Sequence, residues 1–272
     1  MTAATKLPIS VCVAGVSGEV GRLLAKSILE QDDLRLTSAV ARSASGRTVG
    51  ALLGCDCDLD IRPSLAEALE RDRFDVLVDY TSANVAYANV RAGLEAGIPV
   101  VVGTSGITAE EFEQLDRLAR DKKIGAIHGN FAITATLAQI FAADAANHLK
   151  SWEIIEFAHD GKIDAVSATA RELANRLAER GGPERKLALD AFVGDNRSRG
   201  ATIEGTQVHA LRLPGMVAGF EIIFGRGHER LTIRHEALTR AEPYIGGTLL
   251  AIRKAPQLIG VHRGLESVLA LN

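Results

Sequence analysis

Apolar residues in the first half of the chain alternate between strand-like runs and helical spacing. An apolar, β-branched run at residues 9–14 leads into a segment from Val20 to Leu29 whose apolar positions repeat with the period of a helix. The same alternation predicts strands at 34–40, 74–79, 97–102 and 124–128. It also predicts helices at 84–96 and from Thr108, where Glu111 completes a capping box. The alternation predicts an α/β fold with a Rossmann-like, doubly wound parallel sheet, whose ligand lies at the carboxyl ends of the strands.

The pattern changes after a helical stretch at residues 133–149. We expect a strand at 152–158, a helix at 165–180, three strands at 202–209, 219–224 and 230–235, a helix at 241–255 and a closing segment at 264–271. Successive strands without helices between them favour a mixed or antiparallel sheet, and hence a second α+β domain. The predicted division is residues 1–131 with 240–272 for the first domain and 132–239 for the second.

Three glycines follow the first strand at intervals of three. Gly15 allows a sharp turn, Gly18 leaves backbone amides open to a pyrophosphate, and Gly21 allows close packing of helix on strand. The spacing is G-x-x-G-x-x-G rather than the commoner G-x-G-x-x-G, and an ordinary strand–helix turn is the alternative. The position between a strand and a helix favours a dinucleotide-binding turn, with the predicted contacts Gly15, Val16, Ser17, Gly18, Glu19, Val20 and Gly21.

The end of the second strand indicates which dinucleotide binds. Enzymes that prefer NAD carry an acidic residue about 20 residues after the glycine turn, where it binds the ribose 2′-hydroxyl. This chain has Ala41 and Arg42 there, followed by serines and Arg47. A cation with hydroxyls suits a 2′-phosphate, so NADPH is expected to be preferred and NADH to remain possible. The alternative is a solvated basic loop.

Composition and charge narrow the classes of function that the chain could have. The formal net charge is −3, which gives no indication of binding to nucleic acid or to a membrane surface. No apolar run approaches the ~20 residues of a membrane span, and residues 1–6 lack an apolar signal core. The three cysteines have neither C-x-x-C nor paired-histidine spacing, so no disulfide framework or metal site is expected. A cytoplasmic protein is the prediction.

The densest polar stretch joins the strand at 152–158 to the following helix. It places His159, Lys162, Ser167 and Thr169 beside the free amides of a helix N-terminus. Cations, hydroxyls and unpaired amides are the groups that bind a carboxylate, so a small anionic substrate is expected. The alternative is a solvated loop in which Ser167 or Asp164 only caps the helix.

Residues 156–170 resemble the signature E-x-H-H-x-x-K-x-D-A-P-S-G-T-A of the 4-hydroxy-tetrahydrodipicolinate reductase family, also called dihydrodipicolinate reductases. The resemblance extends over nearly the whole chain, including Asp79-Tyr80-Thr81, the run 102–106, Asn130-Phe131 and Arg240. It implies NAD(P)H-dependent reduction of a cyclic imine or enamine dicarboxylate in lysine and diaminopimelate biosynthesis. It also implies a homotetramer built through the second domain, which binds substrate.

The resemblance extends the predicted site. It implies a catalytic Lys162, a substrate clamp of His159, Ser167, Ala168 and Thr169, and further cofactor contacts at Thr81, Gly103, Thr104, Ser105, Asn130, Phe131 and Arg240. Together with the glycine turn and Arg42, these residues form the complete predicted site.

Four positions depart from the family pattern. Ala158 replaces the histidine assigned there as proton donor, and Ala168 replaces a glycine whose amide holds a substrate carboxylate. Val166 replaces a proline, and Glu19 stands where many members carry a cofactor-binding arginine. With Ala158 unable to donate a proton, Lys162 is the expected donor. The changes leave two alternatives open, an imine reductase with another substrate and a non-catalytic nucleotide-binding paralogue.

Overall fold

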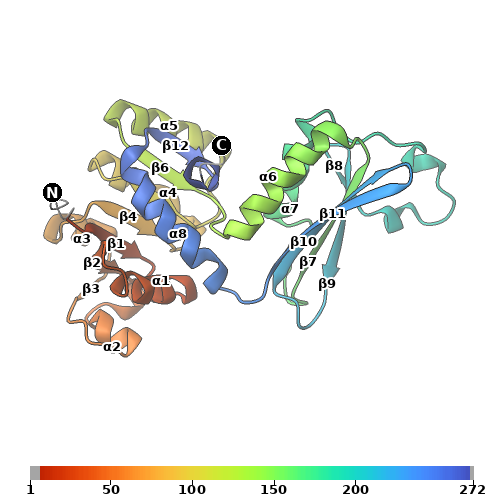
Figure 1. Cartoon of the computed structure of the whole chain (residues 1–272). Helices are drawn as coiled ribbons and strands as arrows, with labels where there is room; N and C mark the ends of the chain where they lie inside the picture. Colours follow the sequence, from red (N-terminus) through yellow and green to blue (C-terminus); the bar gives the residue numbers. More distant parts are fainter. Residues whose placement is uncertain (1–6, 270–272) are drawn as a thin grey trace, which may run out of the picture. The chain divides into compact units, whose positions relative to one another are not determined.

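A computed structural model describes residues 7–269, so the outermost residues of the predicted domains lie outside the described part. The chain forms two compact units (Figure 1). Unit 1 extends to Ile133 and resumes at Ala241, and unit 2 is Thr134–Arg240. Ile133 therefore belongs to unit 1, where it packs against the core, and Arg240 belongs to unit 2. The boundaries lie two residues and one residue from those expected at 131/132 and 239/240.

In the described part of the chain, unit 1 contains a seven-stranded sheet with the strand order β12-β6-β5-β4-β1-β2-β3. All neighbouring strands are parallel, which confirms the predicted doubly wound fold. The strand order reverses at β1, where ligands of such sheets bind. The strands are β1 (Ile9–Ala14), β2 (Leu34–Val40), β3 (Ile61–Arg62), β4 (Val76–Asp79), β5 (Val100–Val102), β6 (Gly125–His128) and β12 (Gly260–Arg263).

Helices cover both faces of this sheet because its strands are apolar on both sides. Leu24 of α1 and Ile252 of α8 belong to one core layer, and these two helices lie side by side (Figure 1). Ala68 of α3, Leu94 of α4 and Leu115 of α5 belong to the other layer. The helices are α1 (Glu19–Leu29), α2 (Val49–Leu53), α3 (Leu65–Arg71), α4 (Ala83–Glu95), α5 (Ala109–Lys122), α8 (Glu242–Lys254) and α9 (Glu266–Leu269), with short 3₁₀ turns η1 (Arg42–Ala44) and η4 (Ala255–Gln257).

Unit 2 is built on a mixed sheet with the order β11-β10-β7-β9-β8. Only β7 and β9 are parallel among its paired strands in residues 134–240. The second α+β unit with a mixed sheet is therefore confirmed. Its elements are α6 (Ile133–His148), β7 (Trp152–Ala158), α7 (Ala168–Ala178), η2 (Leu189–Ala191), η3 (Asn196–Arg199), β8 (Ala201–Ile203), β9 (Thr206–Arg212), β10 (Ala218–Arg226) and β11 (Glu229–Ala237).

The two faces of β7 differ in exposure. Ile154, Glu156 and Ala158 are buried, and α7 packs on β7, β8 and β9. Glu153 and Ile155 point to the opposite face and are only half-buried. The alternation follows from the two-residue period of a strand, and it places the Glu156 carboxylate inside the unit.

One predicted strand is wrong. The run at 202–209 is a hairpin of β8 and β9, because Glu204 and Gly205 adopt left-handed backbone angles (φ +45° and +80°) and turn the chain. Glycine tolerates this conformation at no steric cost, so Glu204-Gly205 was the turn signal. As a result β9 continues to Arg212, beyond the predicted end of the strand. Strand β12 carries no periodic apolar pattern, since its four residues include His262 and Arg263, and it was not predicted.

Candidate functional site

The carboxyl ends of β1, β2 and β4 surround a cavity of about 500 Å³ in unit 1. It lies where the strand order reverses, the expected position for a ligand of a doubly wound sheet. The predicted cofactor residues that line it are Gly15, Ser17, Gly18, Arg42 and Thr81.

The three glycines of the turn serve different purposes. A Cβ on Gly15 (φ +89°) would lie 2.3 Å from the Tyr80 carbonyl oxygen, and one on Gly21 would lie 2.1 Å from the Gly15 oxygen. Both residues must therefore be glycine for the turn and α1 to pack. A Cβ on Gly18 would lie 3.3 Å from the Gly15 oxygen and would meet nothing nearer. This contact is tight but needs a shift of only a few tenths of an ångström, so packing restricts Gly18 much less than Gly15 and Gly21.

The N-terminus of α1 is uncapped. Gly18 occupies the N-cap position, and no side chain accepts a hydrogen bond from the first turn. The backbone amides of residues 19–21 have no acceptor among residues 7–269. Three free amides at the positive end of a helix dipole favour the binding of an anion. The side chains around them lie differently: Val16 is buried, Val20 is half-buried against the core, and Glu19 is exposed.

The loop after β2 presents one unpaired cation to the cavity. Arg42 begins η1, is exposed, and forms no hydrogen bond or ion pair with residues 7–269. Arg47, by contrast, donates to the Ala51 carbonyl at 2.9 Å. The Ser43 hydroxyl lies 3.0 Å from that of Ser17, so this loop is joined directly to the glycine turn.

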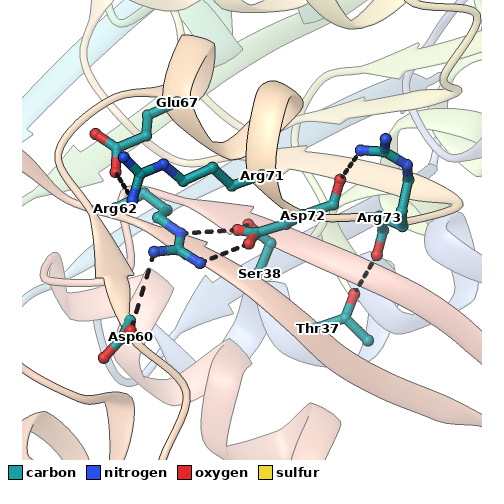
Figure 2. A network of polar contacts seen from close by, with 8 residues as sticks. All are labelled: Thr37, Ser38, Asp60, Arg62, Glu67, Arg71, Asp72 and Arg73. Carbon is teal, nitrogen blue, oxygen red and sulfur yellow. Dashed lines mark hydrogen bonds and ion pairs between the residues drawn. The ribbon is translucent and has the colours of Figure 1, made fainter.

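A half-buried ion pair supports this side of the cavity (Figure 2). Arg62 donates to both oxygens of Asp72, at 3.1 and 2.7 Å, and the Ser38 hydroxyl donates to the same carboxylate at 2.7 Å. Burial alone would raise the pKa of Asp72, but the hydrogen bonds from Arg62 and Ser38 hold it below its ordinary value. The Arg62 carbonyl accepts the Ala41 amide at 3.0 Å. The pair therefore holds β3 against the residue that precedes Arg42.

Asp79 joins two of the loops predicted to face the cofactor. Its carboxylate is fully buried at the end of β4 and accepts the Thr81 amide and hydroxyl at 3.1 and 2.8 Å. The Thr104 hydroxyl and the Asn89 amide donate to it at 2.7 Å each. Four neutral donors thus satisfy a buried carboxylate and fix the loops after β4 and β5 relative to each other.

His128 extends this arrangement to β6. Its Nε2 lies 3.1 Å from the Thr104 carbonyl oxygen, and its ring packs edge-on against Phe112 at 4.6 Å between centroids. Burial lowers the pKa of His128, and the charge of Arg263 acts in the same direction. A neutral His128 that donates to Thr104 holds the β5 loop in place.

The other predicted cofactor residues of unit 1 do not line the cavity. Gly103 lies beneath the Tyr80 ring, where a Cβ would come within 2.1 Å of Cε1. Thr104 is buried on Asp79, and Phe131 is buried in edge contact with Tyr80. Ser105 is exposed, and the Asn130 side chain accepts the Ala132 amide at 2.9 Å. The geometry of Gly103, Thr104 and Phe131 therefore reflects packing of the loops.

In unit 2 the polar loop holds its cation in an ion pair. The Lys162 ammonium lies 2.5 Å from an Asp164 carboxylate oxygen, and the Lys162 amide donates to the His159 carbonyl at 3.1 Å. The hydrogen bond from Lys162 holds the pKa of Asp164 below its ordinary value. Lys162 and His159 are half-buried, whereas residues 160, 161 and 163–165 are exposed.

The loop ends at the N-terminus of α7. Ser167 is the N-cap, and its hydroxyl accepts the Ala170 amide at 3.2 Å. Its own amide donates to the Glu156 carboxylate, so the Ala168 and Thr169 amides remain without an acceptor among residues 7–269. Ala168 is exposed, and its methyl group leaves its amide free.

The departures from the family signature lie within the folded unit. Ala158 and Val166 are buried, and Ala158 stands beside Arg212 in the register of β7 and β9. Arg240 is exposed at the end of unit 2. Within residues 7–269, no group of three His, Cys, Asp or Glu side chains could hold a metal ion, and no helix is long and apolar enough to cross a bilayer.

Sequence reasoning did not identify Asp79, Asp72, Glu156 or Arg212 as site-supporting residues. A buried acidic residue at the end of an apolar strand was the available signal for Asp79 and Glu156. Arg212 lies 56 residues from its partner Glu156, so no local pattern could pair them.

A parallel sheet with a dinucleotide-type glycine turn, joined to a unit with a cationic loop at a helix N-terminus, defines a protein with a Rossmann-like nucleotide-binding fold, the class to which many nicotinamide-dependent oxidoreductases belong. Residues 9–131 match the family profile described as dihydrodipicolinate reductase, N-terminus, and residues 132–269 match its C-terminus. The chain belongs to the dihydrodipicolinate reductase family.

Relatives match over nearly their whole length. The chain is 38% identical to the 4-hydroxy-tetrahydrodipicolinate reductase of Listeria welshimeri, covering 96% of this chain and 100% of the relative. It is 40% identical to that of Moorella thermoacetica, covering 96% and 98%. The dipicolinate-bound dihydrodipicolinate reductase from Paenisporosarcina sp. TG-14 has a TM-score of 0.83 at 27% identity and covers 96% of this chain and 100% of that one. These matches favour the main prediction over its two alternatives.

Proposed function

We propose that this chain is an NAD(P)H-dependent reductase that converts 4-hydroxy-tetrahydrodipicolinate to tetrahydrodipicolinate in lysine and diaminopimelate biosynthesis. The observation that carries the proposal is the full-length family match together with the retained polar loop. That loop keeps His159, Lys162, Ser167 and Thr169 of the family signature. The exposed or half-buried positions of all four suit contact with a small dicarboxylate.

The cavity of unit 1 suits a dinucleotide. The uncapped α1 amides fit a pyrophosphate, and the free space at Gly18 lets it approach the backbone. The Arg42 guanidinium, exposed and unpaired within residues 7–269, fits a 2′-phosphate, so NADPH is the preferred cofactor. The bound cofactor supplies the hydride. The exposed Arg240 is proposed as a further contact, as the family resemblance implies.

The residues of unit 2 bind the substrate and deliver the proton. The Ala168 and Thr169 amides and His159 hold carboxylates. The 4-hydroxyl group of the substrate leaves as water, which gives the conjugated imine. Hydride addition to that imine must then be matched by one proton on the resulting anionic nitrogen or enamine. Lys162 transfers that proton from its ammonium Nζ, because Ala158 has no ionisable group and Lys162 is the ammonium held in this loop. Asp164 keeps the ammonium directed before substrate arrives.

The remaining predictions extend this proposal to the whole protein. Family resemblance supports a homotetramer formed through the sheet of unit 2, and the biosynthetic role suits the cytoplasm. Light scattering coupled to size exclusion measures the first, and fractionation of cells that express a tagged chain measures the second.

The test is turnover with purified protein. The substrate is generated enzymatically in the assay, and oxidation of NADPH and of NADH is followed by absorbance at matched concentrations. We expect turnover with both cofactors and a lower KM for NADPH. No oxidation of either cofactor, together with intact binding of NADPH, would support the non-catalytic paralogue instead.

A further inference from the structure

A buried carboxylate and an arginine hold the polar loop of unit 2 in place through its backbone. Glu156 is 3% exposed in β7, and its two oxygens accept the Ser167 amide at 3.1 and 3.0 Å. Arg212, at the end of β9, donates to one of these oxygens at 2.8 Å. The same guanidinium nitrogen donates to the Asp164 carbonyl at 2.5 Å. One ion pair therefore joins two strands, the loop and the start of α7.

The loop has few other attachments. Residues 160, 161 and 163–165 are exposed, and the Ile163 side chain is entirely in solvent. Within the loop, the Lys162 amide contacts the His159 carbonyl, and the Lys162 ammonium contacts Asp164. Asp164 is thus held on both sides, by Lys162 through its carboxylate and by Arg212 through its carbonyl. The position of the ammonium consequently depends on Arg212.

The same pair decides which helix amides remain free. Glu156 occupies the Ser167 amide, which fixes Ser167 as the N-cap and directs its hydroxyl to Ala170. The Ala168 and Thr169 amides are left as the open donors of the first turn. A shift of Ser167 would change both the number and the direction of these donors.

We propose that Glu156 and Arg212 are positioning residues of the substrate clamp, which fix Lys162 and the open α7 amides without touching substrate. The inference rests on the proposed function, because it concerns the same clamp. The inference goes beyond the proposed function because it assigns roles to two residues outside the predicted site. The negative charge of Glu156 is essential to this role, since both of its oxygens accept hydrogen bonds. A glutamine would turn one acceptor into a donor facing the Ser167 amide.

The chain offers a matched control on the same strand. Glu153 lies three residues before Glu156, on the opposite face of β7, and is also ion-paired. It forms an ion pair with Arg199, and its other carboxylate oxygen accepts a hydrogen bond from His209 Nε2 at 2.7 Å. Glu153→Gln removes the same charge from the same strand but leaves the clamp untouched.

The experiment compares Glu156→Gln, Arg212→Lys and Glu153→Gln with wild type in the full chain. Dipicolinate affinity is measured by calorimetry in the presence of NADPH, alongside NADPH affinity by fluorescence and turnover. Because a displacement of about 1 Å in a positioned group costs on the order of 100-fold, we expect at least about tenfold weaker dipicolinate binding and lower kcat/KM in Glu156→Gln. NADPH affinity should stay within about twofold. Arg212→Lys, which keeps the charge but loses the fork, should fall between Glu156→Gln and wild type.

Several outcomes overturn the inference. One is equal dipicolinate affinity in Glu156→Gln and Glu153→Gln, and another is a parallel loss of NADPH and dipicolinate affinity, which indicates a merely structural role. If Glu156→Gln fails to fold, Arg212→Lys decides alone, and wild-type dipicolinate affinity in that variant overturns it. Wild type that binds dipicolinate without turnover would contradict the proposed function and still leave the clamp measurable. Wild type that does not bind dipicolinate overturns the clamp itself.

Discussion

Both units present the first turn of an 11-residue helix after a strand and a loop, but the residues at the N-cap differ. In α1 the N-cap is Gly18, which has no side chain, and three amides stay open. In α7 the N-cap is Ser167, whose hydroxyl takes the Ala170 amide, and two amides stay open. A wide, uncapped end suits a pyrophosphate, whereas a narrower end beside a lysine suits a carboxylate. Under the proposed function, the choice of cap residue adapts the same helix end to two different anions.

The buried carboxylates behind the two helix ends differ in the same way. Asp79 is satisfied by four hydrogen bonds from neutral groups. Glu156 is satisfied by one amide and by the Arg212 guanidinium. The first arrangement fixes loops through short contacts near β4, and the second joins strands distant in sequence. Only the Glu156 arrangement places a cation, Arg212, in contact with the loop that it supports.

The largest expected effect concerns the lysine that distinguishes the α7 site from the α1 site. Lys162→Ala should lower kcat by ~10²–10⁴-fold, the usual contribution of a general acid, while NADPH affinity is unchanged. Steady-state kinetics and a fluorescence titration measure the two quantities. An equal loss of NADPH affinity would show that the loop serves the nucleotide or the fold.

The glycines of the α1 turn separate packing from binding. Gly21→Ala places a Cβ 2.1 Å from a backbone oxygen, so we expect a loss of about 3 kcal/mol or more in the free energy of unfolding. Gly18→Ala has ordinary backbone angles, and its Cβ at 3.3 Å from the Gly15 oxygen requires a shift of only a few tenths of an ångström, so we expect the fold to be retained at a smaller cost than in Gly21→Ala. Its methyl group should instead weaken NADPH binding by about tenfold, because it occupies the space through which the pyrophosphate approaches the backbone. Urea unfolding and a cofactor titration of both variants test the distinction, which fails if Gly18→Ala binds NADPH like wild type.

These glycines also show where sequence reasoning succeeds. Strand, turn and helix are local, so the spacing of Gly15, Gly18 and Gly21 is enough to predict their geometry. The parallel sheet follows from the same local alternation. By contrast, the Glu156–Arg212 pair depends on the register of β7 with β9, and the extent of β9 was missed because the turn at Glu204-Gly205 was not recognised. Gly103 and Thr104 were correctly placed on a loop, but their packing against Tyr80 and Asp79 is a tertiary property.

Arg42 is expected to separate the two nicotinamide cofactors. Arg42→Ala removes the unpaired cation beside the α1 site, so NADPH affinity should fall by ~1.5–3 kcal/mol while NADH affinity changes little. Arg47→Ala is the matched control, since its guanidinium is bound to the Ala51 carbonyl. Titration of both cofactors against both variants measures the effect. Equal losses for NADPH and NADH in Arg42→Ala would contradict a role in recognising the 2′-phosphate.

The smallest expected effect is on the pH dependence of the free energy of unfolding. It concerns His128, which holds the same β5 loop as Asp79. Burial lowers the pKa of His128 in the folded chain below its ordinary value near 6.5, so the unfolded chain binds this proton first as pH falls. The stability contributed by neutral His128 is therefore complete above pH ~6.5 and is lost as pH falls below it, by at most about 1.4 kcal/mol per pH unit. His128→Gln should flatten the fall in unfolding free energy just below that pH, where the depressed carboxyl groups such as Asp72 are still ionised. Urea unfolding across pH 5–7.5 measures the slope, with the exposed His228→Gln as control. An unchanged slope in His128→Gln would mean that the imidazole does not hold the β5 loop as a neutral donor to Thr104.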